Sequence, residues 1–266
     1  MNDVNQPVPF DPHRFETAAA HYLSGRPYYA PTLFGRVARL CGLTDTHRVL
    51  DLGCGPGQIA IGFAFLSGAV VAIDPEPEML RIAASAAVAV PNIRFLQASS
   101  YDLGPAFGSF HLVTIGRAFH WMDRVATLKA LDGMVEADGA IALFEEHRPK
   151  VPDNDWREPF EALVNRYAGD DAERARRKAA GWWRHEAVLL DSAFGRLERI
   201  SVIDRRHTPV GNFVDRALSM SSTSRRRIGD KADALADEVR TLMNTVAHDG
   251  LVTEVIESAA LIARRP

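Results

Sequence analysis

Cysteine is scarce in this sequence, whose 266 residues include only Cys41 and Cys54. A disulfide framework needs more cysteines than this, so a reducing compartment is expected. No apolar run approaches the ~20 residues that span a membrane. The first 13 residues are polar, with three prolines, and lack the basic-then-apolar order of a secretion signal. These absences predict a cytoplasmic protein with no membrane partner.

A surplus of positive charge is also lacking. Lysine and arginine number 31 against 34 aspartates and glutamates, a net charge of −3. Nucleic-acid-binding domains are usually basic, so no nucleic-acid partner is expected. The composition, 47% hydrophobic and 24% charged, is that of a globular chain with ample core, forming one large domain or one domain with a cap.

Three glycines at alternate positions close the segment 49–57, which reads Val-Leu-Asp-Leu-Gly-Cys-Gly-Pro-Gly. Strand-forming residues precede the glycines, and an apolar-periodic segment begins near Gln58, so we predict a strand, a tight turn and a helix. Glycine permits the sharp turn and lets a ligand lie against the main chain. The free N–H groups at the helix start favour an anionic or carboxylate-bearing ligand.

The following apolar segment ends in an acid. Residues 69–74 read Ala-Val-Val-Ala-Ile-Asp, the pattern of a buried parallel strand with Asp74 at its carboxyl end. Ligands of open α/β sheets bind outside these strand ends, where an acid can accept hydrogen bonds from both ribose hydroxyls. The two segments together predict a nucleoside ligand.

The glycine spacing separates two classes of nucleoside cofactor. Dinucleotide-binding proteins use G-x-G-x-x-G, whereas Gly53, Gly55 and Gly57 give G-x-G-x-G and Gln58 occupies the remaining glycine position. With Asp74 at the next strand end, this sequence resembles the class I S-adenosylmethionine-dependent methyltransferases. The resemblance implies an α/β, Rossmann-like fold with a seven-stranded, mostly parallel sheet, helices on both faces and a helical cap. It also implies S-adenosyl-L-methionine as cofactor and S-adenosyl-L-homocysteine as product.

Two further stretches resemble the small-molecule group that includes trans-aconitate methyltransferase. Residues 22–29 carry its Tyr-x-x-x-Arg-Pro-x-Tyr pattern, which implies a lid over the methionine end of the cofactor; a packing corner between two helices is the alternative. Residues 117–121 read Arg-Ala-Phe-His-Trp, with Arg117 where glutamine is common. His120 there has the ordinary pKa of a general base near neutral pH, although a His-Trp pair can also serve packing alone.

Site residues are carried over from the resemblance position by position. The glycine turn is expected to cradle the methionine portion and Asp74 the ribose, while Met79, Ser99 and Ser100 face the adenine. Ser99 departs from the family, which commonly has an acid there. The expected cofactor contacts are Tyr22, Arg26, Tyr28, Asp51, Gly53, Cys54, Gly55, Gly57, Asp74, Pro75, Met79, Ser99, Ser100, Tyr101, Gly116, Arg117 and Ala118. The expected substrate contacts are His120, which is also the catalytic candidate, Trp121, Trp182 and Trp183.

The chain divides into three expected parts. Residues 1–43 form an N-terminal helical lid, with two helices around a break at residues 25–27. Residues 44–150 form the cofactor-binding core, in which we expect a strand over residues 110–116 and a turn at residues 137–139. Residues 151–266 complete the sheet, with strands near 197–207 and 251–264, and insert the helical cap. The run Glu145-Glu146-His147 is not predicted to bind a metal, because neighbouring residues of a strand point to opposite faces.

The expected activity is methyl transfer from S-adenosylmethionine to a small molecule, with an oxygen acceptor, hydroxyl or carboxylate, favoured. An NAD(P)-dependent Rossmann oxidoreductase and a non-catalytic S-adenosylmethionine-binding protein are the alternatives. No feature of the sequence specifies the acceptor or an oligomeric state.

Overall fold

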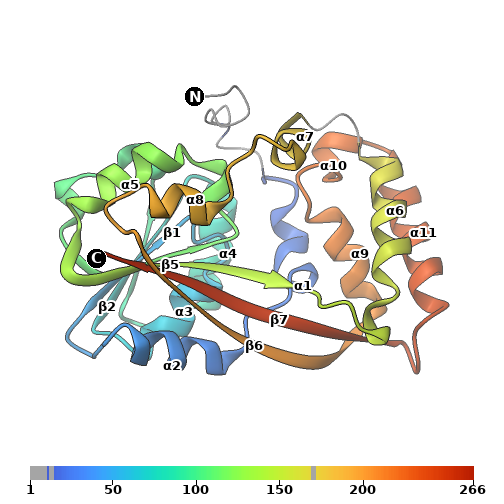
Figure 1. Ribbon diagram of the computed structural model, residues 1–266. Helices are drawn as coiled ribbons and strands as arrows, with labels where there is room; N and C mark the ends of the chain where they lie inside the picture. The colour runs from blue at the N-terminus through green and yellow to red at the C-terminus, as the bar shows by residue number, and fades with distance from the viewer. Residues whose placement is uncertain (1–10, 12–14, 169–171) are drawn as a thin grey trace.

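One seven-stranded sheet organises the protein (Figure 1). The computed structural model describes Asp11, residues 15–168 and residues 172–266. The strand order is β3-β2-β1-β4-β5-β7-β6. Strands β1 to β5 pair in parallel, and β7 is antiparallel to both β5 and β6. The strands are β1 (Arg48–Leu52), β2 (Ala69–Asp74), β3 (Ile93–Gln97), β4 (Phe110–Gly116), β5 (Val135–His147), β6 (Arg196–Pro209) and β7 (Leu251–Arg264). The predicted α/β fold with a seven-stranded, mostly parallel sheet is confirmed.

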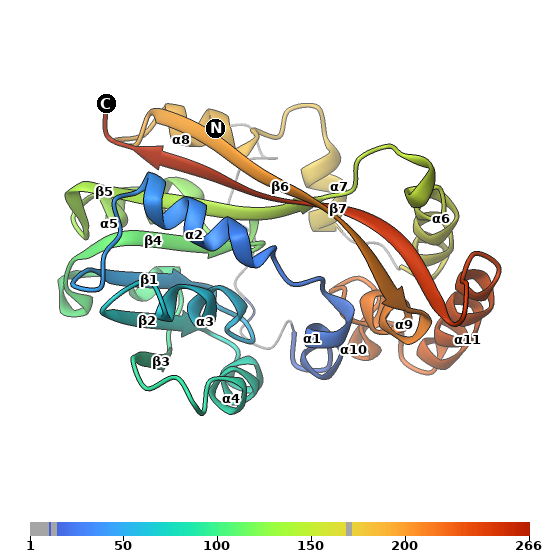
Figure 2. The ribbon, with the colours of Figure 1, turned by 90° about the horizontal axis from the view of Figure 1, so that it is seen from below.

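Helices cover both faces of the sheet (Figure 2). Helices α2 (Pro31–Leu40) and α3 (Gln58–Ala64) bury one apolar stripe each against the first face, together with part of α4 (Pro77–Ala86). Helices α5 (Arg124–Asp132) and α8 (His185–Leu190) cover the opposite face. Alternate residues of β1 enter the two layers, with Val49 in the first and Leu50 in the second, as the two-residue period of a strand requires.

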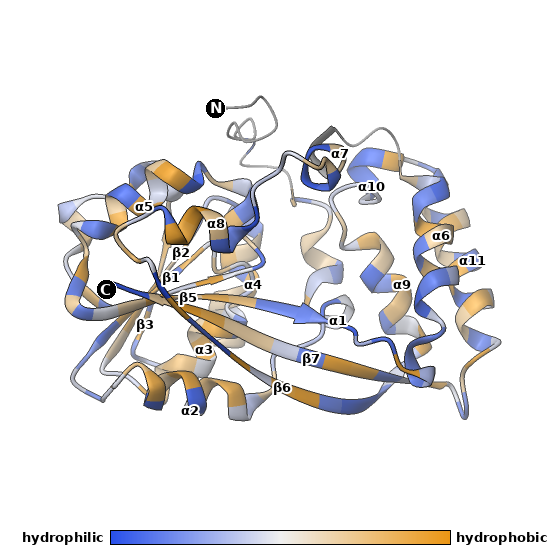
Figure 3. Ribbon diagram, viewed as in Figure 1, coloured by the Kyte–Doolittle hydropathy of each residue, from blue (hydrophilic) through white to orange (hydrophobic). Residues whose placement is uncertain are grey.

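A helical cap stands beside the sheet with its own apolar core. Helices α6 (Arg157–Tyr167), α9 (Val210–Leu218) and α11 (Lys231–Asn244) bury residues such as Phe160, Phe213 and Val239 against one another. These helices carry both apolar and polar segments (Figure 3), as expected for amphipathic helices. Two short helices, α7 (Ala172–Lys178) and α10 (Arg225–Ile228), complete this half. Strands β6 and β7, with 14 residues each, continue past the other strands into the cap, where Pro209 pairs with Leu251.

The predicted break near residues 25–27 is present, but the helix before it is short. A 3-10 turn (Ala19–His21) and the single turn α1 (Tyr22–Gly25) precede it, and α2 begins at Pro31. Gly25 packs against the backbone of α9, where a Cβ atom would lie 2.4 Å from the carbonyl carbon of Asp215. Residues 1–10 and 12–14 of the expected lid lie outside the described residues.

Strand β5 starts earlier than expected. We predicted a turn at residues 137–139, but these residues belong to β5, whose pairing with β4 shifts register between Phe110 and Leu112. Gly139 lies in this irregular part, where a Cβ atom would lie 2.7 Å from the carbonyl oxygen of His111. No helix within the described part of the chain is long and apolar enough to cross a membrane.

Candidate functional site

The glycine turn lies at the carboxyl end of β1, beside the point where the strand order reverses. Gly53, Gly55 and Gly57 have φ of +72°, +52° and +81°, values that side chains with a Cβ rarely adopt. The amides of Gly53 and Cys54 both donate to the carbonyl of Ile73, at 2.8 and 2.9 Å, which ties the turn to β2. Gly57 then precedes the first residue of α3. The predicted order of strand, turn and helix is therefore present.

Asp74, at the end of β2, stabilises the glycine turn by hydrogen bonds. One of its oxygens accepts from the amide of Gly55 at 2.8 Å and the other from the amide of Glu76 at 2.9 Å. Burial raises the pKa of Asp74 to about 6, although these two hydrogen bonds act in the opposite direction. Each carboxylate oxygen has a second lone pair, and Asp74 lines a cavity, so the group can still accept hydrogen bonds from a ligand.

Asp51 lies in the interior of the sheet. Its oxygens accept from the Thr114 hydroxyl at 2.9 Å and from the Ala60 amide at 3.0 Å, and the residue is 0% exposed. Burial raises its pKa to about 7. A ligand therefore cannot reach the Asp51 carboxylate, in contrast to the expected direct contact with the cofactor. The side chain instead links α3 to β4 beneath the turn.

Two adjoining cavities open over the carboxyl ends of the strands. The smaller is bounded by the turn and by the ends of β2 and β4, with Gly53, Asp74 and Tyr101 in its wall. The larger, of about 440 Å³, extends toward the cap. Phe15, Ala118 and Trp121 line both cavities, so a ligand could reach from the turn to the cap. Of the expected contacts, the cavities bring together Tyr22, Arg26, Gly53, Asp74, Pro75, Ser100, Tyr101, Arg117, Ala118, His120 and Trp121.

Several expected contacts do not line either cavity. Met79 packs in the core, 3% exposed. Ser99 uses its hydroxyl within its own turn, donating to Asp102 at 2.7 Å and accepting from the amide of Tyr101. Tyr28 is 60% exposed, under the guanidinium of Arg206. The others that do not line the cavities are Asp51, Cys54, Gly55, Gly57 and Gly116.

The expected substrate contacts Trp182 and Trp183 also lie elsewhere. Trp183 is 43% exposed and lines a separate hollow beside α5. Trp182 packs edge-on against His185 and lies under the guanidinium of Arg124. Neither tryptophan lines the two cavities, because their segment packs along α5, and His185 faces the larger cavity instead.

Arg117 begins the loop after β4 with a strained backbone. Its φ is +55°, a value uncommon for a residue other than glycine and found preferentially at functional sites. Its guanidinium pairs with Glu146 of β5 and donates to the carbonyl of Pro27 at 2.8 Å. Burial acts to raise the pKa of Glu146, but Arg117 and Arg148 outweigh it and hold that pKa at about 2.

Two histidines face the larger cavity. The rings of His120 and His185 lie nearly parallel, with centroids 6.5 Å apart. Burial lowers the pKa of His120 well below its ordinary value, and Arg177 and other nearby cations lower it further. Burial and Arg124 lower the pKa of His185 to about 4. Both imidazoles are therefore neutral near pH 7.

Glu146 and His185 are missing from the set expected from the sequence. The rule that identified Asp74 also identifies Glu146, because both residues lie at the carboxyl end of a parallel strand. His185 reaches the cavity only through the packing of α8 on the sheet, and no local pattern marks it.

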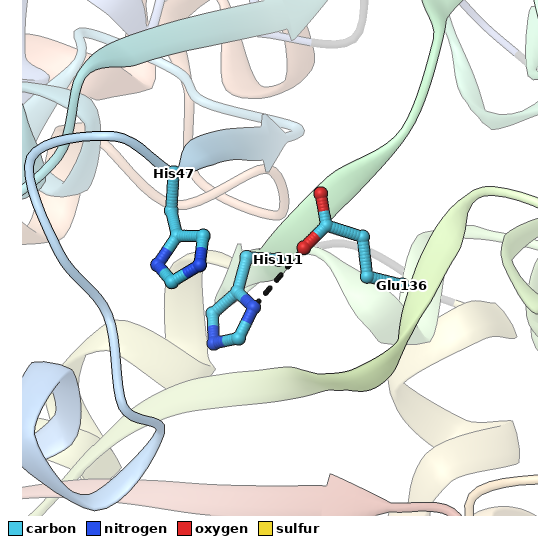
Figure 4. Close-up of side chains that lie close together, drawn as sticks. All are labelled: His47, His111 and Glu136. Atoms are coloured by element: carbon cyan, nitrogen blue, oxygen red, sulfur yellow. Dashed lines mark hydrogen bonds and ion pairs between the residues drawn. The ribbon is translucent and has the colours of Figure 1, made fainter.

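A cluster of two histidines and a glutamate lies at the amino ends of β1, β4 and β5 (Figure 4). Ligand atoms of His47, His111 and Glu136 lie within 4.8 Å of one another, a spacing that could suit a metal ion. However, the two imidazoles stack at 3.8 Å with an 8° angle between planes, so their in-plane lone pairs run parallel instead of converging. The Nδ1 atom of His47 also accepts from the amide of Thr44 at 3.0 Å. This geometry favours a hydrogen-bonded stack over a metal centre.

The segment that carries the glycine turn matches known sequences. Residues 49–139 match the family described as methyltransferase domain. The chain is 30% identical over 109 residues to the uncharacterized methyltransferase YcgJ of Bacillus subtilis, covering 40% of this chain and 43% of that protein. It is 28% identical over 176 residues to trans-aconitate 2-methyltransferase of Enterobacter sp., covering 64% of each. The matches therefore span less than two thirds of these relatives.

A solved structure shares the fold over nearly the whole chain. A methyltransferase from Thiobacillus denitrificans, determined in complex with S-adenosyl-L-homocysteine, superposes with a TM-score of 0.54. The alignment covers 98% of this chain and 100% of that one at 13% sequence identity. At this identity the likeness concerns the fold.

Proposed function

We propose that this chain, whose residues 49–139 form a methyltransferase domain of the class I S-adenosylmethionine-dependent type, transfers a methyl group from S-adenosylmethionine to an oxygen atom of a small molecule. The observation that carries the proposal is the pair of adjoining cavities, one beside the glycine turn and Asp74, the other beneath the cap. A nucleoside bound in the first directs its reactive end into the second.

The residues of the smaller cavity fit the nucleoside end of the cofactor. Gly53 lets the loop after β4 pack closely on the turn, since a Cβ atom there would lie 2.7 Å from the Cβ of Ala118. Asp74 offers acceptors to the ribose hydroxyls, and Ser100 and Tyr101 border the same cavity beside the adenine. Tyr22 and Arg26, from the lid, border the larger cavity, where the methionine end belongs.

The larger cavity positions the methyl acceptor and excludes water from it. When bound, S-adenosylmethionine supplies a methyl group already activated by its sulfonium. The walls formed by His120, Trp121 and the cap residue Met220 would hold an acceptor in line with that methyl. Orientation of this kind can contribute roughly 7–11 kcal/mol to the lowering of the barrier. A base is needed only when the acceptor oxygen carries a proton, and His120 is the group placed to receive it.

The first test is calorimetric titration of the full chain with S-adenosylhomocysteine, with NAD in a parallel cell. We expect micromolar binding of S-adenosylhomocysteine and none of NAD. Binding of NAD alone would favour the oxidoreductase. Binding of S-adenosylhomocysteine without methylation of any member of a panel of small acids, alcohols and phenols would favour the non-catalytic binding protein.

Cofactor affinity should fall in acid. The ionised carboxylate of Asp74 accepts hydrogen bonds better than the acid form, and its pKa is about 6. Lowering the pH from 7.5 to 5 therefore weakens S-adenosylhomocysteine binding, by up to about tenfold for each pH unit below that pKa. Calorimetry across this range measures the change. In the Asp74→Asn variant the same titration should be flat between pH 5 and 7.5, and an equal slope in both proteins would assign the effect to another group.

His120 distinguishes the two kinds of oxygen acceptor. With a hydroxyl acceptor, His120→Gln should lower kcat by about 10²-fold or more, because glutamine cannot take the proton that leaves the acceptor oxygen. With a carboxylate acceptor the same variant should leave kcat within a few-fold of the parent protein. Unchanged turnover of a hydroxyl acceptor would remove the assignment of His120 as base.

A further inference from the structure

Helices α5 and α8 lie side by side over one face of the sheet (Figure 1), and a hollow of about 230 Å³ opens between them on the surface. The buried side chains of Leu128 and Val188 form part of its lining. Two larger apolar residues of the same hollow stay exposed, Val125 at 48% and Trp183 at 43%. Leu190, the last residue of α8, is 59% exposed. This α5–α8 surface therefore presents clustered apolar groups to solvent, which is typical of a surface that binds a protein.

The exposed indole of Trp183 is attached to a fixed main chain. Arg124 of α5, itself 8% exposed, donates to the carbonyl of Trp183 at 2.6 Å. The same guanidinium lies 4.4 Å from the ring centre of Trp182, and that ring packs edge-on against His185. A main chain that is already held in place has little conformational entropy to lose when a partner covers the side chain. Trp183 therefore has the properties of an interface hot spot, which is often a tryptophan.

The rim of the α5–α8 surface carries charges of both signs. Lys129 belongs to α5 and Asp191 follows the last residue of α8, and both are exposed. Neither forms an ion pair with another residue of the described part of the chain, whereas Asp132, the other acid of the rim, pairs with Arg265. One unpaired charge of each sign leaves the rim without the net charge that would attract a strongly acidic or strongly basic partner.

A second copy of the same chain complements both of these charges. The lysine comes from α5 and the aspartate from the end of α8, the two helices that border the hollow. A two-fold axis between these helices sets α5 of one copy against α8 of the other. Each Lys129 then faces the partner's Asp191, and the two Trp183 rings meet near the axis over the apolar lining. Such a contact is isologous, because both copies use the same surface.

We propose that the α5–α8 surface is the interface of a symmetric dimer of this chain, with Trp183 at its centre and two reciprocal ion pairs between Lys129 and Asp191 at its rim. This inference does not depend on the proposed function. It bears on the site nevertheless, because the segment 182–185 joins Trp183 of the interface to His185 of the larger cavity. The partner subunit thus supports one wall of that cavity from outside.

Analytical ultracentrifugation of the full chain tests the interface. We expect the parent protein, with a chain mass of 29.3 kDa, to sediment as a dimer at micromolar concentration. Trp183→Ser should weaken the dimer about 30-fold or more, the loss found on removing a hot-spot side chain. Phe65→Ser is the matched control, since this aromatic residue is 75% exposed at the end of α3 on the opposite face of the sheet. It should leave the dimer unchanged, and circular dichroism shows that each variant is folded.

An exchange of charges tests the pairing and the two-fold symmetry together. Lys129→Glu and Asp191→Lys should each weaken the homodimer about tenfold or more, because like charges then meet at both ends of the interface. In an equimolar mixture of the two variants, a heterodimer has one reversed ion pair and one original pair. The mixture should therefore dimerise within about threefold of the parent affinity. A chain that carries both substitutions should likewise recover the homodimer.

Three results would overturn the inference. A parent protein that remains monomeric at about 100 μM has no such dimer, and the hollow is then left to a different protein or a small molecule. A dimer that Trp183→Ser does not weaken has its interface elsewhere on the molecule. Charge variants that fail to complement each other in the mixture rule out the reciprocal pairing of Lys129 with Asp191.

Discussion

Replacing Glu254 with glutamine should lower the free energy of unfolding by about 3–5 kcal/mol, the range found when one partner of a buried ion pair is removed. Glu254 is 0% exposed and accepts hydrogen bonds from Arg216, Arg148 and Thr208. The neutral amide leaves Arg216 without its carboxylate partner and leaves Arg148 with Glu146 alone. The NH2 group of the amide also points a donor at other donors. Urea denaturation followed by circular dichroism measures the loss.

A surface glutamate provides the control for this experiment. Glu238 of α11 pairs with Arg166 and accepts from the Tyr167 hydroxyl, but it is solvent-exposed. Glu238→Gln should change the free energy of unfolding by less than about 1 kcal/mol. If Glu254→Gln is no more destabilising than Glu238→Gln, the buried network does not hold the cap to the sheet as described.

Asp74→Ala should weaken S-adenosylhomocysteine by about 1–3 kcal/mol, roughly 5- to 150-fold. The change removes the proposed acceptors for the ribose. It also removes the acceptors that fix the amides of Gly55 and Glu76, so the glycine turn itself loosens. Calorimetric titration at pH 7.5 measures the affinity.

The contribution of the ribose contact can be separated from that of the turn. Asp74→Asn keeps one oxygen acceptor for a main-chain amide, so it should retain more affinity than Asp74→Ala while losing the charge-assisted bonds. Parent-like affinity in the alanine variant would contradict the placement of the ribose at Asp74.

Sequence patterns predicted the parts of this fold that depend on local periodicity and turn chemistry. The predicted segments 69–74, 110–116 and 251–264 coincide with β2, β4 and β7. Segment 69–74 is an apolar run that ends in an acid, and segment 251–264 follows the turn residues Asp249 and Gly250, so local chemistry marks where these strands lie. The expected turn at 137–139 was wrong, because pairing with β4 at Val135 and again from Ala140 keeps the irregular stretch between them within β5.

The cap side of the site depends on contacts between distant residues. Arg117 meets Glu146 across 29 positions, and Arg216 meets Glu254 across 38. No spacing in the sequence predicts such pairs. The residues around Glu146 therefore indicate a charged side chain at a strand end but not its partner. Trp182 and Trp183 are expected at the substrate because the resemblance implies a substrate-covering cap in this region, but the packing of their segment beside α5 decides where the rings point.

The long strands β6 and β7 have a consequence for how this protein can diversify. The apolar core of the cap shares none of its buried residues with the two layers around the sheet. The cap joins the sheet through these two paired strands, β5 and the lid contacts. Substitutions at residues 220–222, which follow α9 and line the larger cavity, can therefore reshape that cavity while the glycine turn and Asp74 stay as they are, so its ligand selectivity can evolve as a module.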